Sequence, residues 1–258
     1  MSGPVLYCGD PHGQFRHIIK SANDLRASAV VLLGDMEPQR PLAEEMAGIT
    51  VPWYFIPGNH DADSVQLAER VWAPAIAERN IHARVVILPD GTRLAGLGGV
   101  FRGAVWYPSE SPATETETHF RTRTEHAEAT PPVDRWRNGT HFKHWATIYP
   151  DELDRLADMR ADVLITHEAP GYHQNGFGIL DTLAQLMGVK VAVHGHHHDR
   201  LDSRDRWAQQ GFKSYGVGLR GITAINADGS ATVIVPGELD EQRNFRQRYM
   251  DVFKDVGA

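Results

Sequence analysis

Short apolar runs that end at a glycine or a histidine recur along this 258-residue chain and constrain its fold more than any other feature. The first three are Val5–Gly9, Ala29–Leu33 and Val51–Ile56, and each has the length of a buried strand. Between the first two runs, Gln14–Ala27 has the spacing of apolar residues that a helix requires. Strands that alternate with helices are typical of α/β folds.

The later runs predict more strands, and some of them are joined as hairpins. Val85–Leu88 and Arg93–Leu97 flank Pro89-Asp90-Gly91, a favourable hairpin turn. Further strands are expected at Val163–Ile165, Val189–Val193, Phe212–Val217, Ile222–Asn226 and Ala231–Val235, and further helices at Asp151–Arg160 and Ile179–Met187. Early alternation and late hairpins together predict an α/β sandwich with a pair of mixed sheets at its centre.

The stretch 101–147 breaks this rhythm. It is rich in Thr, Glu, Pro, His and Trp and has no clear period. An insert of that length in a compact domain is usually functional or mobile. We therefore predict a single domain over residues 1–258 with a lid or insertion at 101–147. The polar tail from Gly237 carries scattered apolar residues and predicts a C-terminal surface helix.

The composition argues against several classes of protein. Hydrophobic residues make up 41% and charged residues 23%, which is ordinary for a globular protein, and no apolar run approaches the roughly 20 residues of a membrane-spanning helix. A net charge of -7 argues against an extended nucleic-acid surface. The single cysteine, Cys8, excludes an internal disulfide, and the N-terminus lacks the pattern of a signal peptide. We expect a cytoplasmic protein without membrane contact.

Five segments that follow apolar runs carry side chains suited to metal binding. They are Asp10-Pro11-His12, Gly34-Asp35, Gly58-Asn59-His60-Asp61, His167 and Gly195-His196-His197-His198. An α/β sheet presents its ligands beyond the carboxyl ends of its strands, so all five can meet at one edge. In Asp10-x-His12 and His196-x-His198 we expect extended backbone, on which alternate side chains point the same way. Each segment alone can be an ordinary turn or a satisfied polar residue, but their order at successive strand ends favours a metal site.

This order of motifs resembles that of the calcineurin-like metallophosphoesterase superfamily. The resemblance implies a four-layer αββα sandwich with a two-metal site at one edge. It implies that one metal is held by Asp10, His12, Asp35 and His198, and the other by Asp35, Asn59, His167 and His196, with Asp35 bridging. It also implies that His60 is the catalytic histidine beside the leaving-group oxygen and that Asp61 orients it.

The resemblance further implies a hydrolase acting on phosphoric ester bonds. A metal-activated hydroxide would attack phosphorus, and no covalent phospho-enzyme is required. The expected cofactors are two divalent or trivalent ions (Mn, Fe, Zn, Ni or Co, with Mn favoured), since all accept mixed oxygen and nitrogen ligands. The expected partner is a phosphate-ester substrate, with nucleotides among the candidates; the sequence does not predict an oligomeric state.

The substrate class depends on finer details of the motifs. The opening Gly9–Gln14 is similar to that of the Ser/Thr protein phosphatases and diadenosine-tetraphosphate hydrolases. However, no Arg-Gly pair follows Gly34-Asp35 at the matching place, and Pro57 stands where the protein phosphatases carry arginine. The two missing arginines favour a phosphodiesterase over a phosphomonoesterase, such as a nucleotide or protein phosphatase. A non-catalytic scaffold on the same fold is a further alternative, but such members lose motif residues.

Several other residues are candidates for supporting roles. Arg102, close after Gly98-Gly99, is a candidate for binding the substrate phosphate, with a solvated surface arginine as the alternative. His197 lies between two ligands and is expected to point away from the metals, with Asp199 supporting the ligands from behind. The insert adds His119, His126, His141 and His144, which we expect at the surface, with extra metal ligands as the alternative. We expect its aromatic residues to pack the lid against the body, with stacking on a base as the alternative; they are Trp106, Tyr107, Trp136 and Trp145.

Overall fold

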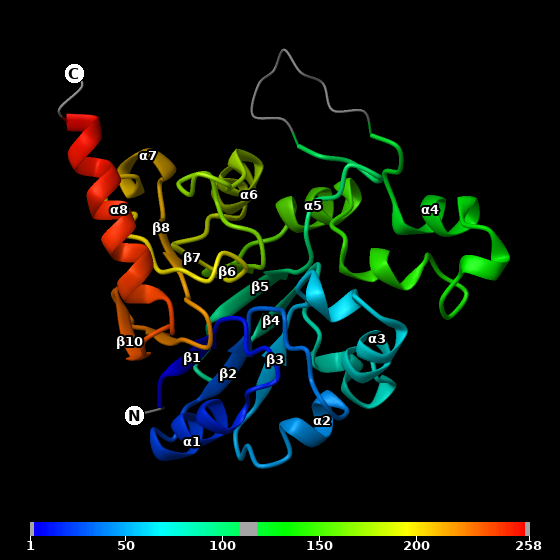
Figure 1. Cartoon of the computed structure of the whole chain (residues 1–258), viewed down its shortest axis with the longest axis horizontal. Coiled ribbons are helices and arrows are strands. Elements are labelled where there is room, and N and C mark those ends of the chain that lie inside the picture. The colour runs from blue at the N-terminus through cyan, green and yellow to red at the C-terminus, as the bar shows by residue number, and fades with distance from the viewer. Residues whose placement is uncertain (1–2, 109–117, 256–258) are drawn as a thin grey trace.

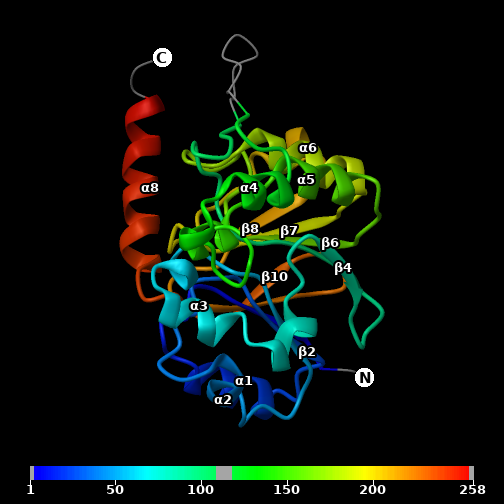
Figure 2. The same cartoon turned by 90° about the vertical axis from the view of Figure 1, so that its right-hand side faces the viewer.

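The computed structural model describes residues 3–108 and 118–255. Two five-stranded sheets pack face to face, and helices cover their outer faces (Figures 1 and 2). The predicted α/β sandwich with two mixed sheets is therefore confirmed.

The first sheet has the strand order β10-β9-β1-β2-β3. Its strands are β1 (Val5–Cys8), β2 (Ala29–Leu32), β3 (Trp53–Phe55), β9 (Ile222–Ile225) and β10 (Ala231–Val235). The neighbours β1, β2 and β3 run parallel, whereas β9 is antiparallel to both β1 and β10. The three parallel strands therefore end at the same edge.

The second sheet has the order β4-β5-β6-β7-β8. Its strands are β4 (Arg84–Ile87), β5 (Arg93–Leu97), β6 (Val163–Thr166), β7 (Val191–His194) and β8 (Lys213–Gly216). Only β4 is antiparallel to its neighbour, as the predicted hairpin with β5 requires. Between the sheets lies a buried apolar cluster that includes Tyr7, Val31, Ile165 and Val193, which explains why the central strands are apolar throughout.

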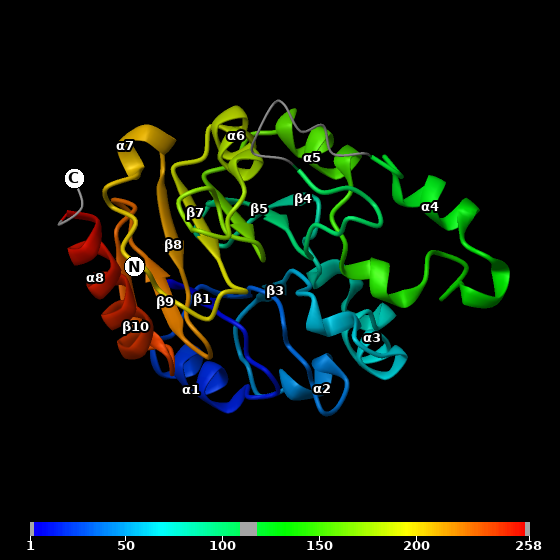
Figure 3. The same ribbon diagram turned by 45° about the horizontal axis from the view of Figure 1, so that its top comes forward.

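Helices form the two outer layers, as Figure 2 shows. On the first sheet lie α1 (Arg16–Asp24) and α2 (Leu42–Glu45), and on the second lie α5 (Pro150–Ala157) and α6 (Gly178–Met187). The remaining helices are α3 (Val65–Val71), α4 (Arg123–Ala129), α7 (Trp207–Gln210) and α8 (Asp240–Asp255). Helices α8 and α4 lie at opposite ends of the molecule (Figures 1 and 3). Among the described residues, no helix is both long and apolar enough to cross a membrane.

The segment 101–147 is built from short elements in its described part. It contains α4 and the 3-10 helices η3 (Pro132–Asp134) and η4 (Phe142–Ala146). Helix α4 begins at a capping box formed by Thr122 and Glu125. Trp136 packs against Trp72 and Trp145, with ring centroids 6.3 and 4.4 Å away, so this tryptophan packs the segment against the rest of the chain. Elements this short give no recognisable period in a sequence.

Candidate metal centre

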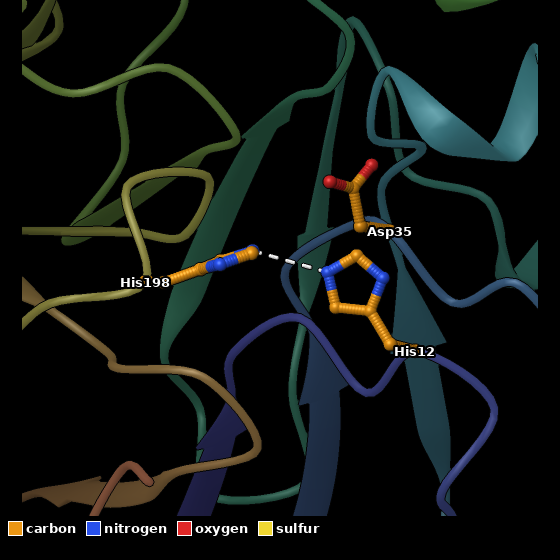
Figure 4. A group of neighbouring side chains, drawn as sticks. All are labelled: His12, Asp35 and His198. Carbon is orange, nitrogen blue, oxygen red and sulfur yellow. Dashed lines mark hydrogen bonds between the residues drawn. The ribbon is translucent and has the colours of Figure 1, made fainter. Parts of the chain in front are cut away.

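Loops that follow the parallel strands of both sheets meet at one edge of the sandwich. The loops after β1, β2 and β3 carry Asp10-Pro11-His12, Gly34-Asp35 and Gly58-Asn59-His60-Asp61. The loops after β6 and β7 bring His167 and Gly195–His198 to the same place. Figure 4 shows His12, Asp35 and His198, which come from three of these loops and lie next to one another.

The first group of potential metal ligands is His12, Asp35 and His198, whose ligand atoms lie within 4.8 Å of one another. The Nε2 atoms of His12 and His198 are 3.0 Å apart (Figure 4). His12 Nδ1 pairs with the carboxylate of Glu37. If this pair fixes the proton on Nδ1, Nε2 presents its lone pair to the group, as a metal ligand must.

The second group is Asp35, His167 and His196, again with ligand atoms within 4.8 Å of one another. His167 Nδ1 is 2.8 Å from the Leu33 carbonyl, to which it can only donate. Its Nε2 atom lies 3.4 Å from Asp35 Oδ2 and 3.1 Å from Asn59 Oδ1. Because Asp35 belongs to both groups, its carboxylate lies between them.

Asp10 is fully buried, but it belongs to neither group. Its two carboxylate oxygens accept the His196 N–H at 3.0 and 3.1 Å, and Oδ1 lies 3.9 Å from His167 Nδ1. In this arrangement, Asp10 joins the loop after β1 to the loop after β7.

The backbone at the site is left-handed, not extended. Asp10 and His12 have φ of 38° and 42°, and His196 and His198 have φ of 69° and 54°. The expectation that strand periodicity aligns the side chains of each pair is therefore wrong. Strands β1 and β7 end before the pairs, and tight loops turn the side chains into the site instead. Asp35 is also left-handed, with φ of 49°, and such unfavourable backbone clusters at functional sites.

Two glycines allow these loops to approach the ligands closely. A Cβ atom on Gly58 would lie 2.2 Å from Asp35 Oδ1, and one on Gly34 would lie 2.4 Å from His167 Nδ1. Neither position can take a side chain unless the loops move apart. Both glycines therefore make room for neighbouring ligands.

His60 has a different partner from the one expected. Its Nδ1 atom lies 2.6 Å from Asp63 Oδ2, whereas Asp61 accepts the backbone N–H groups of Met36, Glu37 and Gly58. The expectation that Asp61 orients His60 is therefore wrong. His60 begins η1 (His60–Ala62), and side chains three residues apart lie above one another in a 3-10 helix. Asp61 instead ties the loop after β2 to the loop after β3.

The electrostatics of the site favour a cation. Burial alone would lower the pKa of His167, but the carboxylates of Asp35 and Asp10 raise it to about 10. Burial alone would raise the pKa of Asp35, but His167 and the His60 N–H lower it. Burial lowers the pKa values of His196 and His198 to about 3 and about 4, so both imidazoles are neutral at pH 7 and able to bind metal.

Sequence reasoning missed three acidic residues at the site. Glu37 and Asp63 pair with His12 and His60, and both follow a motif residue by two or three positions. The third, Glu168, is buried directly after His167; it accepts the Phe101 N–H at 3.2 Å and lies 3.7 Å from His196 Nε2. Their closeness to the motif residues along the sequence could have marked them as candidates. Only the folded loops show which histidine each carboxylate contacts.

Arg102 lies beside this site. Burial lowers the pKa of its guanidinium, whereas the nearby carboxylates of Asp63, Glu168 and Asp35 raise it. Its Nε atom is buried and has no hydrogen-bond partner within residues 3–108 and 118–255. A buried guanidinium donor without a partner is available to an oxyanion ligand. The histidines of the insert, His119, His126, His141 and His144, join no group of potential ligands in the described part of the chain.

Comparison with known proteins identifies the family. The family described as calcineurin-like phosphoesterase matches residues 3–200. The chain belongs to this family. It is therefore a metal-dependent phosphoesterase, a hydrolase of phosphoric esters.

Individual proteins are similar to the chain in sequence or in fold. An uncharacterized protein of Haemophilus influenzae is 36% identical over 220 residues, which cover 84% of this chain and 92% of that protein. Two solved structures share the fold: TT1561 of Thermus thermophilus (TM-score 0.55, 16% identity, 91% of this chain and 99% of that one) and a dimetal phosphatase from Danio rerio (TM-score 0.50, 15% identity, 92% and 98%).

Proposed function

We propose that the chain is a binuclear metallophosphoesterase that hydrolyses phosphodiesters. The observation that carries the proposal is the pair of ligand groups that share the Asp35 carboxylate. His12 and His198 would hold one ion, and His167, His196 and Asn59 the other, with Asp35 between them and Asp10 as a further ligand. The solved structure of similar fold that is described as a dimetal phosphatase supports a count of two.

The donor set fits such ions. It consists of imidazole nitrogens, carboxylate oxygens and one amide oxygen, the mixture that Mn, Fe, Zn, Ni and Co accept, and manganese is favoured here. His12 and His167 each have Nδ1 beside an acceptor, Glu37 or the Leu33 carbonyl, which leaves Nε2 free to bind metal. When bound, the ions supply positive charge to the phosphoryl oxygens and lower the pKa of water toward neutrality.

The chain's own residues would perform the rest of the reaction. Arg102, with its free Nε, is placed to bind a phosphoryl oxygen and orient the substrate. The pKa of His60 is raised; burial opposes the rise, and Asp63, Asp35 and Glu37 cause it. His60 is therefore able to hold a proton and deliver it to the leaving-group oxygen, while Asp63 fixes the orientation of the ring.

A diester substrate is favoured over a monoester by the residues around the phosphoryl site. Arg102 lies near the carboxylates of Asp35 and Glu168, and the two arginines of the protein phosphatases are absent from the matching places. A single guanidinium suits the single negative charge of a diester, whereas the dianionic monoester would be better bound by two. A phosphomonoesterase, acting on a nucleotide or a phosphoprotein, is the alternative.

Metal analysis and a substrate screen test the proposal together. The metal-depleted protein is reconstituted with Mn²⁺, Zn²⁺, Fe²⁺, Ni²⁺ or Co²⁺ and assayed with bis(p-nitrophenyl) phosphate, p-nitrophenyl phosphate and a nucleotide panel. We expect two ions per chain and a higher kcat/KM for the diester. One ion or none per chain would refute the binuclear site, and a higher kcat/KM for the monoester would refute the diester preference. Two ions without activity on any ester would favour the scaffold alternative.

We further propose that the segment 101–147 acts as a cap that helps to set substrate choice. The 3-10 helix η4 packs against η1, which carries His60. Burial lowers the pKa of His144 in η4 to about 4, and the nearby His126 and Arg102 lower it too. The cap thus borders the side of the site where the leaving group and the arginine are expected.

A further inference from the structure

The loop after β7 holds two proposed ligands in an unfavourable conformation. His196 and His198 both have positive φ, which side-chain-bearing residues rarely adopt, and the His197 N–H closes a tight turn onto the Gly195 carbonyl at 2.8 Å. Such a conformation persists only when surrounding contacts hold it in place. Asp10 holds the His196 N–H, and the contacts of His197 and Asp199 show what else holds the loop.

The ring of His197 packs against His173. Its centroid lies 4.0 Å from that of His173 at an interplanar angle of 10°, a parallel stack. His173 lies in the loop after β6, the strand that precedes His167. The stack therefore joins the two loops that carry the imidazoles of the second ligand group, His167 and His196.

A hydrogen bond to the same loop fixes the His173 ring. The Asn175 N–H donates to His173 Nδ1 at 3.1 Å, so the ring proton of neutral His173 lies on Nε2. Nε2 then donates to Asp199 Oδ2 at 3.2 Å. His173 and Asp199 are only 4% and 5% exposed, which shields this bond from water. His173 thus contacts the ligand loop twice, through His197 and through Asp199, one residue on either side of His198.

We propose that His173 is a positioning residue that braces the loop 195–199 in its metal-binding conformation before any metal arrives. The inference rests on the proposed binuclear site, since the braced loop carries one ligand of each group. His173 contacts His197 and Asp199, whereas His196 and His198 belong to the two ligand groups that share Asp35. Its loss should weaken metal binding, as removal of residues behind metal ligands commonly does by about 10- to 100-fold.

The molecule offers a matched control. His126 stacks on Phe120 with ring centroids 4.2 Å apart and an interplanar angle of 4°, and its Nδ1 bonds to the Tyr149 hydroxyl at 2.8 Å. This is also a parallel stack with one side-chain hydrogen bond, but it lies in the segment 101–147 and touches no loop that carries a proposed ligand. His126→Ala therefore removes a similar stack without affecting the brace.

The test compares wild type, His173→Ala, His173→Phe and His126→Ala. Hydrogen exchange of the His196 and His197 amides is measured on the metal-free proteins, and Mn²⁺ affinity is measured by competition with a chelator. We expect His173→Ala to speed exchange and to weaken binding of at least one ion about 10-fold or more. His173→Phe keeps the stack, so its exchange rate and Mn²⁺ affinity should lie between those of His173→Ala and wild type. His126→Ala should match wild type in both measurements.

Unchanged exchange and affinity in His173→Ala, or equal losses in His126→Ala, would overturn the brace. A wild-type protein that binds no metal would refute the proposed function, whereas the exchange measurement on metal-free protein still tests the brace. Should His173→Ala fail to fold, Asp199→Ala removes the carboxylate that holds the ring and should give the same changes. Asp199→Asn keeps an acceptor oxygen and should remain close to wild type.

Discussion

Glu152 connects the segment 101–147 to the body of the protein through a buried charge network. Its carboxylate accepts hydrogen bonds from Arg123 at 3.0 Å and from the Tyr149 N–H at 2.9 Å, and it lies 3.1 Å from His82 Nε2. The Gly98 N–H donates to the other ring nitrogen of His82, so His82 Nε2 carries the proton and donates to Glu152. We predict that Glu152→Gln destabilises the fold without changing the metal site.

The size of the effect follows from the pKa of Glu152. Burial alone would raise it, but His82 and Arg123 lower it from the ordinary 4.5 to about 2. A tenfold change in proton affinity corresponds to about 1.4 kcal/mol, so the ionised carboxylate stabilises the folded state by about 3 kcal/mol. The same size is expected for breaking a buried ion pair. For a chain of this length, that loss lowers Tm by about 6–12 °C.

The sign of the pH dependence follows from the lowered pKa. Stabilisation by a carboxylate whose folded pKa is depressed is fully present above the unfolded pKa, near 4.5, and is lost as the pH falls toward about 2. Urea unfolding of metal-free wild type and Glu152→Gln should therefore differ by about 3 kcal/mol at pH 7. The difference should shrink steadily below pH 4.5.

Asp162 provides a control for this prediction. It pairs with Arg93 through two side-chain hydrogen bonds, and these bonds lower its pKa to about 2 as well. However, its side chain is 29% exposed and that of Arg93 is 48% exposed, so water screens the pair. Asp162→Asn should cost less than about 1 kcal/mol. Equal losses for the two variants at pH 7, or a Glu152→Gln difference at pH 3 as large as the difference at pH 7, would refute the reasoning.

Three predictions concern the site itself. Asp35→Asn should lower metal occupancy at both positions in elemental analysis, because a neutral amide bridges two cations poorly, and loss of only one ion would contradict the bridging role. His60→Ala should lower kcat by about 10²–10⁴-fold while the metal content stays normal, and the loss should be smaller for a p-nitrophenolate leaving group. Asp63→Asn should show the same trend more weakly. An equal loss of kcat for all leaving groups would count against proton delivery by His60. Arg102→Ala should lower kcat/KM about 10- to 100-fold, since a charged hydrogen bond contributes roughly 1.5–3 kcal/mol, with unchanged metal affinity; unchanged kcat/KM would exclude it from substrate binding.

The strands could be predicted from the sequence because a strand that is buried on both faces is a continuous apolar run. Such a run can be recognised without knowing which strands lie beside it. The expected strand Ala231–Val235 matches β10, and Val5–Gly9 differs from β1 by one residue. The helix α3 was missed although Ser64 caps it, since its seven residues are too few to show a period. The ligand residues could be proposed from their order alone, but the partner of His60 could not. Whether His60 pairs with Asp61 or with Asp63 depends on whether residues 60–62 form a 3-10 turn, and the packing of the loop decides this.

The segment 101–147 could be recognised from the sequence as an interruption, but its relation to the core could not. A direct way to test a cap is to replace residues 104–144 with a short Gly/Ser linker. In the structure, this replacement would remove Val105 and Trp106, which belong to the core cluster beneath α5 and α6. It would also remove Arg123 and leave the buried carboxylate of Glu152 without this partner. We predict that the replacement abolishes stable folding, so loss of activity in it would carry no information about recognition.

A point change in η4 avoids this difficulty. Lys143 is exposed in the 3-10 helix that packs against η1, so charge reversal there alters the potential beside His60 without removing buried surface. If the cap selects anionic substrates, Lys143→Glu should lower kcat/KM for a nucleotide diester several-fold more than for bis(p-nitrophenyl) phosphate, and added salt should reduce the difference. Lys20→Glu, on the exposed face of α1, is the matched control. An unchanged substrate ranking in Lys143→Glu, or the same change in both variants, would show that this part of the cap plays no role in recognition.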